Sequence, residues 1–92
     1  MGKVDAFSIN GLRLGFHSAD HPPPHFHVKK LGAWEIRVFI ETTQEKSLDF
    51  NVIFSRKEPT SAEKTKIAAL VVAYQEELLQ EWETKVAYRS GF

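Results

Sequence analysis

The sequence predicts an α+β fold, in which an antiparallel sheet of four to five strands is built from hairpins and covered on one face by a long C-terminal helix. Three observations predict it: an Asn-Gly pair between two alternating segments, a second pair of alternating segments around Gly32, and apolar residues at three- and four-residue spacing in the last third of the chain. The 92 residues, 42% hydrophobic and 26% charged, are typical of one globular unit. We therefore expect a single α+β domain over residues 1–92.

Residues 4–9 and 12–17 are predicted to form the first hairpin, closed by Asn10-Gly11. Asn-Gly favours a type I′ turn, because both of its central residues adopt a positive φ angle readily. A two-residue loop sets Ile9 opposite Leu12 and Phe7 opposite Leu14, which gathers the apolar side chains on one face. The other face then carries Ser8, Arg13, Gly15 and His17.

Residues 25–29 and 33–41 are predicted to form a second hairpin, closed by a three-residue loop at 30–32 with Gly32 in the left-handed conformation. A two-residue loop would mix apolar and charged side chains on both faces, so the three-residue register is preferred. It sets Val28 opposite Trp34 and Phe26 opposite Ile36 on the apolar face. On the polar face it pairs His27 with Glu35 and His25 with Arg37.

Residues 47–54 are predicted to add a fifth strand. Its apolar residues alternate, as expected for a strand with one buried face. The side chains predicted to point inward are those of Leu48, Phe50, Val52 and Phe54.

A helix is predicted to begin after Thr60, because Thr60 and Glu63 have the spacing of a capping box. We expect its end between Lys85 and Ser90. Apolar residues recur along it at helical spacing and are expected to cover the sheet. They are Ile67, Leu70, Val71, Tyr74, Leu78, Trp82 and Val86.

All four histidines lie within residues 17–27, at His17, His21, His25 and His27. The last two are separated by one residue on a predicted strand, so both imidazoles leave the same face, about 6.6 Å apart along the strand. Pro22–Pro24 is a stiff lead-in with fixed φ angles and no backbone donors. This segment is the one part of the chain that folding alone does not explain.

The run Asp20-His21-Pro22-Pro23-Pro24-His25-Phe26-His27-Val28 resembles the signature of the DUF4160 family of small prokaryotic proteins. Residues 7–16 are similar to the hairpin that precedes this signature, and residues 77–83 resemble the family's helical C-terminus. Residues 42–57 depart from the family pattern, since the 47–54 run is longer. The resemblance implies no established activity. It suggests a partner in a toxin–antitoxin-like gene pair.

One hypothesis for the histidine segment is a metal site. A His-x-His pair supplies two ligands, and His21, His17 or Asp20 could supply the third. The ligand set we weigh first is His21, His25 and His27, and Glu35 is a candidate to orient His27 from behind. Arg37 argues against a metal, because this register places its fixed positive charge directly opposite His25.

The hypothesis that the sequence favours is a His/Arg strand face that binds an anionic group or a protein partner. This reading uses the Arg37 position and needs no additional ligand. Its candidate ligand-binding residues are His25, His27, Arg37, Glu35, Lys29, Arg13, Asp20 and His21. No catalytic residue and no cofactor is assigned, and a metal ion is kept as the alternative.

A partner protein could also dock without any small ligand, on Pro22–Pro24 or on an unpaired strand edge. Enzymatic activity has the least support. His25 and His27 with Glu35 could perform acid–base chemistry, but the sequence has no recognisable nucleophile motif. We therefore predict a binding or regulatory module rather than an enzyme.

Composition and charge exclude several kinds of site and argue against several kinds of partner. The absence of cysteine excludes disulfides, thiolate metal sites and cysteine nucleophiles. The formal net charge of +0 argues against a nucleic-acid partner. The first residues lack the apolar core of a signal peptide, and no stretch approaches the roughly 18 apolar residues of a membrane span. A cytoplasmic protein without membrane contact is expected.

Overall fold

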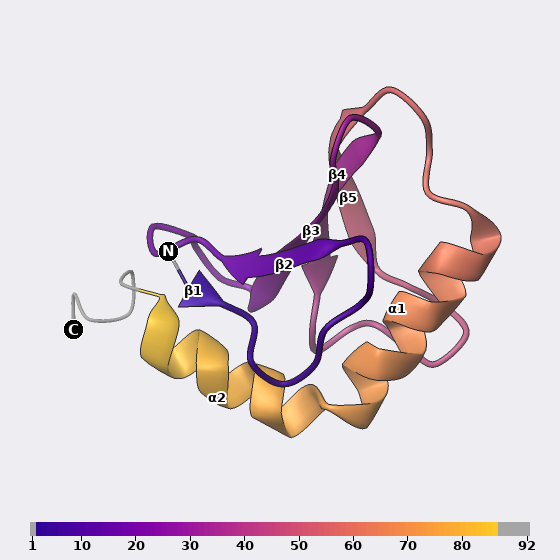
Figure 1. Ribbon diagram of the computed structural model, residues 1–92. Coiled ribbons are helices and arrows are strands. Elements are labelled where there is room, and N and C mark those ends of the chain that lie inside the picture. Colours follow the sequence, from indigo (N-terminus) through magenta and orange to yellow (C-terminus); the bar gives the residue numbers. More distant parts are fainter. Residues whose placement is uncertain (1, 87–92) are drawn as a thin grey trace.

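The computed structural model describes residues 2–86, which form a five-stranded antiparallel sheet followed by two helices (Figure 1). The strands lie side by side in chain order, so the sheet is an open meander. In order, the elements are β1 (Gly2–Lys3), β2 (Arg13–Phe16), β3 (His25–Lys30), β4 (Trp34–Phe39), β5 (Phe50–Ser55), α1 (Ser61–Ala73) and α2 (Gln75–Lys85). The predicted α+β class with an antiparallel sheet is confirmed.

The predicted register of the first hairpin is wrong. β1 pairs with β2 through Gly2 and Phe16, and residues 4–12 leave the sheet as a long connection. This connection descends to the point where the two helices meet (Figure 1). Its Phe7 ring packs 5.6 Å from the ring of Tyr74, because the helices offer it more apolar contact than an exposed ladder would.

The turn inside this connection also differs from the prediction. The Leu12 N–H donates to the Ile9 carbonyl (3.1 Å), which closes a turn around Asn10-Gly11. Gly11 has a φ of +86°, but no non-glycine residue in the described range has a positive φ, so Asn10 does not. A type I′ turn needs a positive φ at both positions and is therefore excluded.

The second hairpin has the predicted faces in a different register. Lys30 pairs with Trp34, so the loop spans residues 31–33, and Gly32 takes the predicted positive φ (+77°). The expected cross-strand pairs are therefore wrong: His27 lies opposite Arg37, and His25 lies opposite Phe39. A shift by two residues leaves every side chain on its face, so the apolar pattern alone could not distinguish the two registers.

The inward orientation predicted for the fifth strand is only half correct. Leu48 and Phe50 pack against the core, whereas Val52 and Phe54 are 53% and 43% exposed. A register irregularity at Glu35 and Ile36 of β4 interrupts the ladder, and β5 extends beyond the helices at its C-terminal end (Figure 1). The helices therefore do not cover that end of the apolar strand.

The single long helix is also wrong, because the chain breaks at Tyr74 (φ −115°, ψ 27°) into α1 and α2. The capping box at Thr60 is confirmed: the Glu63 N–H donates to its hydroxyl (3.0 Å), and the Thr60 N–H donates to the Glu63 carboxylate (2.8 Å). α2 ends at Lys85, the first position of the expected interval, and the later positions from residue 87 lie outside the described residues. Neither helix has the length and apolar composition to cross a bilayer.

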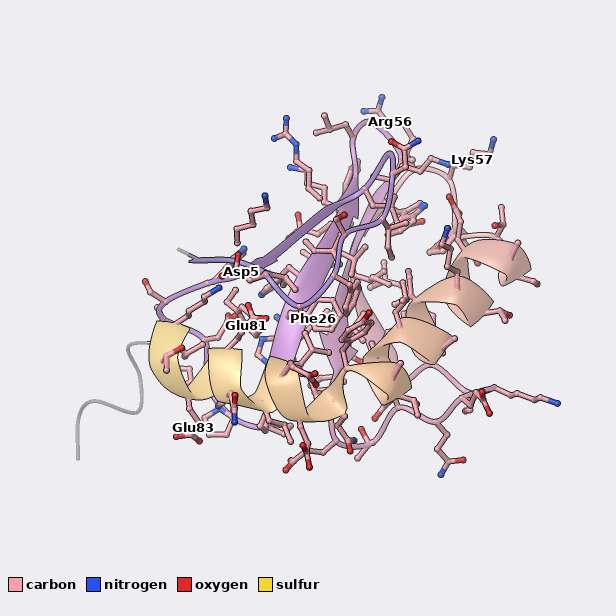
Figure 2. All side chains as sticks on the ribbon, turned by 60° about the horizontal axis from the view of Figure 1, so that its bottom comes forward. Asp5, Phe26, Arg56, Lys57, Glu81 and Glu83 are labelled. Atoms are coloured by element: carbon pink, nitrogen blue, oxygen red, sulfur yellow. The ribbon has the colours of Figure 1, made fainter. Side chains whose placement is uncertain are left out.

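The core lies between the sheet and the helices, with Phe26 of β3 fully buried at its centre (Figure 2). Most of the predicted helical stripe is buried as expected, with Leu70 and Tyr74 half-buried at its margin. The buried helical residues and the cap of α2 are Ile67, Ala68, Val71, Leu78, Trp82 and Val86.

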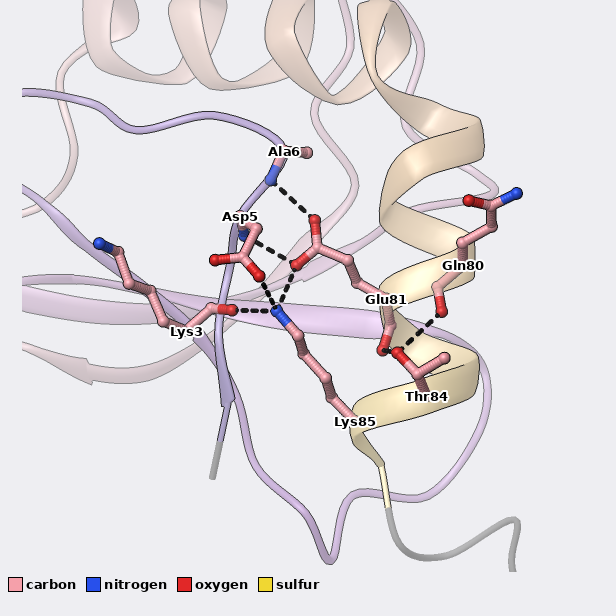
Figure 3. Close-up of polar contacts among 7 residues, drawn as sticks. All are labelled: Lys3, Asp5, Ala6, Gln80, Glu81, Thr84 and Lys85. Carbon is pink, nitrogen blue, oxygen red and sulfur yellow. Dashed lines mark hydrogen bonds and ion pairs between the residues drawn. The ribbon is translucent and has the colours of Figure 1, made fainter.

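Two polar residues of α2 hold the N-terminal segment against this helix (Figure 3). The Glu81 carboxylate accepts from the backbone N–H groups of Asp5 and Ala6, both at 2.7 Å. The Lys85 ammonium donates to the carbonyl of Lys3 (2.6 Å) and to the Asp5 carboxylate (2.7 Å). That hydrogen bond, with the positive charge of Lys85, lowers the pKa of the Asp5 carboxyl. Glu81 thus satisfies two donors of a segment that leaves the sheet.

We predict that Glu81→Gln lowers the free energy of unfolding by about 1–3 kcal/mol, because one of its two acceptor oxygens becomes a donor that faces a backbone N–H or Lys85. Urea unfolding followed by circular dichroism measures the change. Glu77→Gln, the same substitution at an exposed position of α2, is the control and should change it by only a few tenths of a kcal/mol. Equal effects of the two substitutions would contradict this role.

Candidate functional site

β3 carries two buried imidazoles on the face opposite the apolar core. His25 is 4% exposed and His27 is 5% exposed, although alternation places both away from Phe26 and Val28. The segment between β2 and β3 folds back over them and brings Asp20 against both rings. β3 is therefore buried on both faces over its first four residues.

Asp20 is positioned by a local turn. The backbone N–H of Asp20 donates to the His17 carbonyl (3.0 Å), and the His17 N–H donates back to Asp20 Oδ2 (3.2 Å). Such reciprocal contacts are typical of an Asp that closes its own turn. They direct the carboxylate toward the two histidines.

One carboxylate oxygen meets both imidazoles. Asp20 Oδ2 lies 3.0 Å from His27 Nε2 and 3.3 Å from His25 Nε2. One ligand atom from each residue lies within 4.8 Å of the other two. We call Asp20, His25 and His27 the Asp-His-His group.

The far nitrogen of each ring faces an oxygen. His25 Nδ1 lies 2.9 Å from the Pro23 carbonyl, which can only accept, so Nδ1 carries a hydrogen. In the neutral ring, Nε2 then has the free lone pair. His27 Nδ1 lies 3.5 Å from Glu35 Oε2, which is an ion-pair distance without a hydrogen bond. Both rings thus present Nε2 to Asp20.

His17 contacts the Asp-His-His group through His27. Its ring stacks on His27 with centroids 3.7 Å apart and planes 6° from parallel. His17 directly follows β2, whose Gly15 lies opposite His27. His17, His27 and Glu35 form a second group whose ligand atoms lie within 4.8 Å of one another.

Burial lowers the pKa of His27, and the neighbouring His17 imidazole lowers it further. The Asp20 carboxylate acts in the opposite direction, through its charge and its hydrogen bond. The net direction favours the neutral imidazole, which is the form that can donate a lone pair to a metal.

Two hollows open beside the Asp-His-His group, and the predicted site residues divide between them. The Arg37 hollow, about 320 Å³, is lined by Ala19, Asp20, His21, Pro22, Pro23, His25, Arg37 and Phe39. The Lys29 hollow, about 580 Å³, is lined by Gly2, Lys3, Arg13, Leu14, Gly15, His17, His27, Lys29 and Glu35. Arg37 and Arg13 therefore line different hollows, and His21 belongs to neither metal-ligating group.

Sequence reasoning missed two contacts to His25. The Trp82 ring of α2, expected only in the core, lies 5.4 Å from the His25 ring between centroids. The Pro23 carbonyl, which sets the tautomer, carries no signal in side-chain patterns. The Trp82 contact joins distant parts of the chain and depends on the complete fold, whereas the Pro23 contact is local and depends on the backbone conformation of residues 23–25.

An open antiparallel meander, with two histidines on one buried strand face and a carboxylate from the preceding connection against them, defines a small α+β protein with a candidate ligand site. The chain belongs to the DUF4160 family, a domain of unknown function, whose profile matches residues 11–83. The Asp-His-His group, Glu35 and Arg37 all lie within that range. No curated protein and no solved structure matches the chain.

We predict that the neutral His25 ring of the metal-free protein is the tautomer with hydrogen on Nδ1, because the Pro23 carbonyl accepts from that atom. Long-range ¹H–¹⁵N correlation spectra at pH 8, in the presence of a chelator, report the tautomer directly. The urea-unfolded chain is the control, since its rings exchange between both tautomers. A hydrogen found on Nε2 instead would contradict this geometry.

Proposed function

We propose that this protein binds a divalent transition-metal ion, with zinc the first candidate, through Asp20 Oδ2, His25 Nε2 and His27 Nε2. The observation that carries the proposal is the buried Nε2 of His25, which has no hydrogen-bond partner in the described chain and lies 3.3 Å from the Asp20 carboxylate. With the hydrogen of a neutral ring on Nδ1, His25 Nε2 and the Asp20 oxygen are two acceptors facing each other, which is electrostatically unfavourable in a buried place unless a proton or a metal ion lies between them. A bound cation relieves that conflict.

The spacing of the donor atoms supports a metal ion. Two ligand atoms bound to one tetrahedral zinc ion, each about 2.0–2.1 Å from it, are separated by about 3.3 Å. Asp20 Oδ2 lies 3.0 and 3.3 Å from the two imidazole nitrogens. Two of the three separations therefore suit one shared ion, the 3.0 Å separation being also a hydrogen-bond distance, and all three ligand atoms lie within 4.8 Å of one another.

The oxygens next to the second ring nitrogen of each histidine also support a metal ion. A metal-bound histidine usually donates its other ring N–H to a carbonyl or a carboxylate, which fixes the ring. The Pro23 carbonyl has this relation to His25, and the Glu35 carboxylate lies at the Nδ1 side of His27. Two imidazoles and one carboxylate suit zinc and other first-row divalent ions, and three protein ligands leave a coordination position open.

The argument from Arg37 against a metal persists, because Arg37 lies opposite the proposed ligand His27, rather than His25, and lines one hollow with Asp20 and His25. Within residues 2–86 it forms no ion pair with Asp20. Its positive charge belongs to the wall of the Arg37 hollow. The protein partner that the family resemblance suggests stays a prediction.

We expect the protein to bind one equivalent of zinc, measured by isothermal titration calorimetry and by metal analysis after dialysis. His25→Gln should weaken zinc binding by at least about a hundredfold, since even outer partners of a ligand contribute ten- to a hundredfold. His21→Gln is the matched control from the same segment and should leave the affinity within about threefold, because His21 is outside the Asp-His-His group. No binding by the wild type, or equal losses in both variants, would refute the assignment.

Glu35→Gln should weaken zinc binding by about tenfold, because it removes the carboxylate beside His27 Nδ1 without removing a ligand. Asp20→Asn, which changes a proposed ligand, should weaken zinc binding by more than Glu35→Gln does. His17→Gln should weaken it by less. The same titrations measure all three variants. If His17→Gln and Glu35→Gln weakened zinc binding more than Asp20→Asn, the ion would instead be assigned to the His17-His27-Glu35 group.

A further inference from the structure

We infer that the Arg37 hollow binds a small organic anion whose carboxylate or phosphate oxygens are shared between the Arg37 guanidinium and the metal ion. This inference rests on the proposed metal site and names the class of ligand that would complete it.

Among the described residues, Arg37 is a charged side chain without a hydrogen-bond or ion-pair partner. It is partly buried on β4, and its Nε is fully shielded with no hydrogen-bond acceptor in residues 2–86. Within residues 2–86 it forms no ion pair, whereas Lys30 and Lys85 each do. The other guanidinium nitrogens of Arg37 have no hydrogen-bond partner in the described chain and are not shielded, so an anion in the hollow can reach them, and a planar carboxylate or a phosphate matches their donor geometry.

The walls of the hollow describe the rest of the ligand. Phe39 and the two prolines Pro22 and Pro23 give it apolar surface, and Arg37 supplies the charge. Its volume of about 320 Å³ is at the small end of the range for small-molecule sites. An anionic head on a compact apolar or aromatic body fits these walls.

The proposed metal ion would make the second contact to the anion, after that of Arg37. Asp20 and His25 line this hollow, so a metal held by them would lie beside the space that Arg37 borders. A divalent ion and Arg37 carry more positive charge than Asp20 balances. An anion placed between the metal and Arg37 neutralises that excess and forms charge-assisted hydrogen bonds.

The Lys29 hollow provides the contrast. It also contains cations, among them Lys29 and Arg13, but both are exposed on the sheet surface. Exposed ammonium and guanidinium groups stay hydrated and bind anions weakly. Arg13 is therefore a matched control for Arg37, on the same face of the sheet.

The test uses the zinc-loaded protein with benzoate, phenylphosphate and neutral benzamide as probes, followed by chemical shifts and by calorimetry. We expect benzoate or phenylphosphate to bind at least about tenfold more tightly than benzamide, with shifts at Arg37 and Phe39. Tighter benzoate identifies a carboxylate ligand, and tighter phenylphosphate identifies a phosphate monoester. Arg37→Gln should weaken the preferred anion by about tenfold or more and leave zinc affinity within about threefold, while Arg13→Gln should change neither.

Three results would overturn the inference, and they separate it from the metal proposal. Normal zinc binding with no response to either anion would refute the anion site alone. Equal anion binding with and without zinc would refute the claim that the anion contacts both Arg37 and the metal ion. Failure to bind zinc would refute the proposed function and this inference with it.

Discussion

Burial of β3 on both faces is the constraint on which the rest of the structure depends. Phe26 and Val28 fill the core under the helices, and His25 and His27 are covered on the opposite face. A covered imidazole face needs polar partners, because buried ring nitrogens without hydrogen bonds are costly. The turn at residues 17–20 supplies the Asp20 carboxylate, and β4 supplies Glu35. The site is thus the polar half of a doubly buried strand.

That polar half is incompletely satisfied, which separates it from an ordinary structural network. His25 Nε2, His27 Nδ1 and Arg37 Nε are shielded and lack hydrogen-bond partners in the described chain. Native proteins satisfy most buried polar atoms, so several orphans in one small region require an explanation. A cation at the Asp-His-His group would account for the first of them, His25 Nε2. The stability lost to such atoms is a common cost of a preformed binding site.

Other parts of the chain show where local patterns stop being informative. The apolar spacing from Ile67 to Val86 predicts one helix, yet the break at Tyr74 lets two helices cover different parts of the sheet. The alternation in residues 47–54 predicts burial of Val52 and Phe54, but nothing covers that end of β5 within residues 2–86. A periodic pattern identifies which side chains share a face. Whether another element reaches that face depends on lengths and angles set elsewhere in the chain.

The sequence by itself determined most of the elements and the division of their faces. Residue spacing over short segments is enough to predict the cap at Thr60 and the positive φ at Gly32. It also predicts that four side chains share one face of the sheet, those of His25, His27, Glu35 and Arg37. Only the tertiary structure decided the two-residue shift that sets Arg37 opposite His27, the fold-back of Asp20 and the approach of Trp82 to His25. The physical reason is that strand alternation repeats every two residues, so it separates faces but not registers. Contacts between distant segments depend on how the whole chain packs.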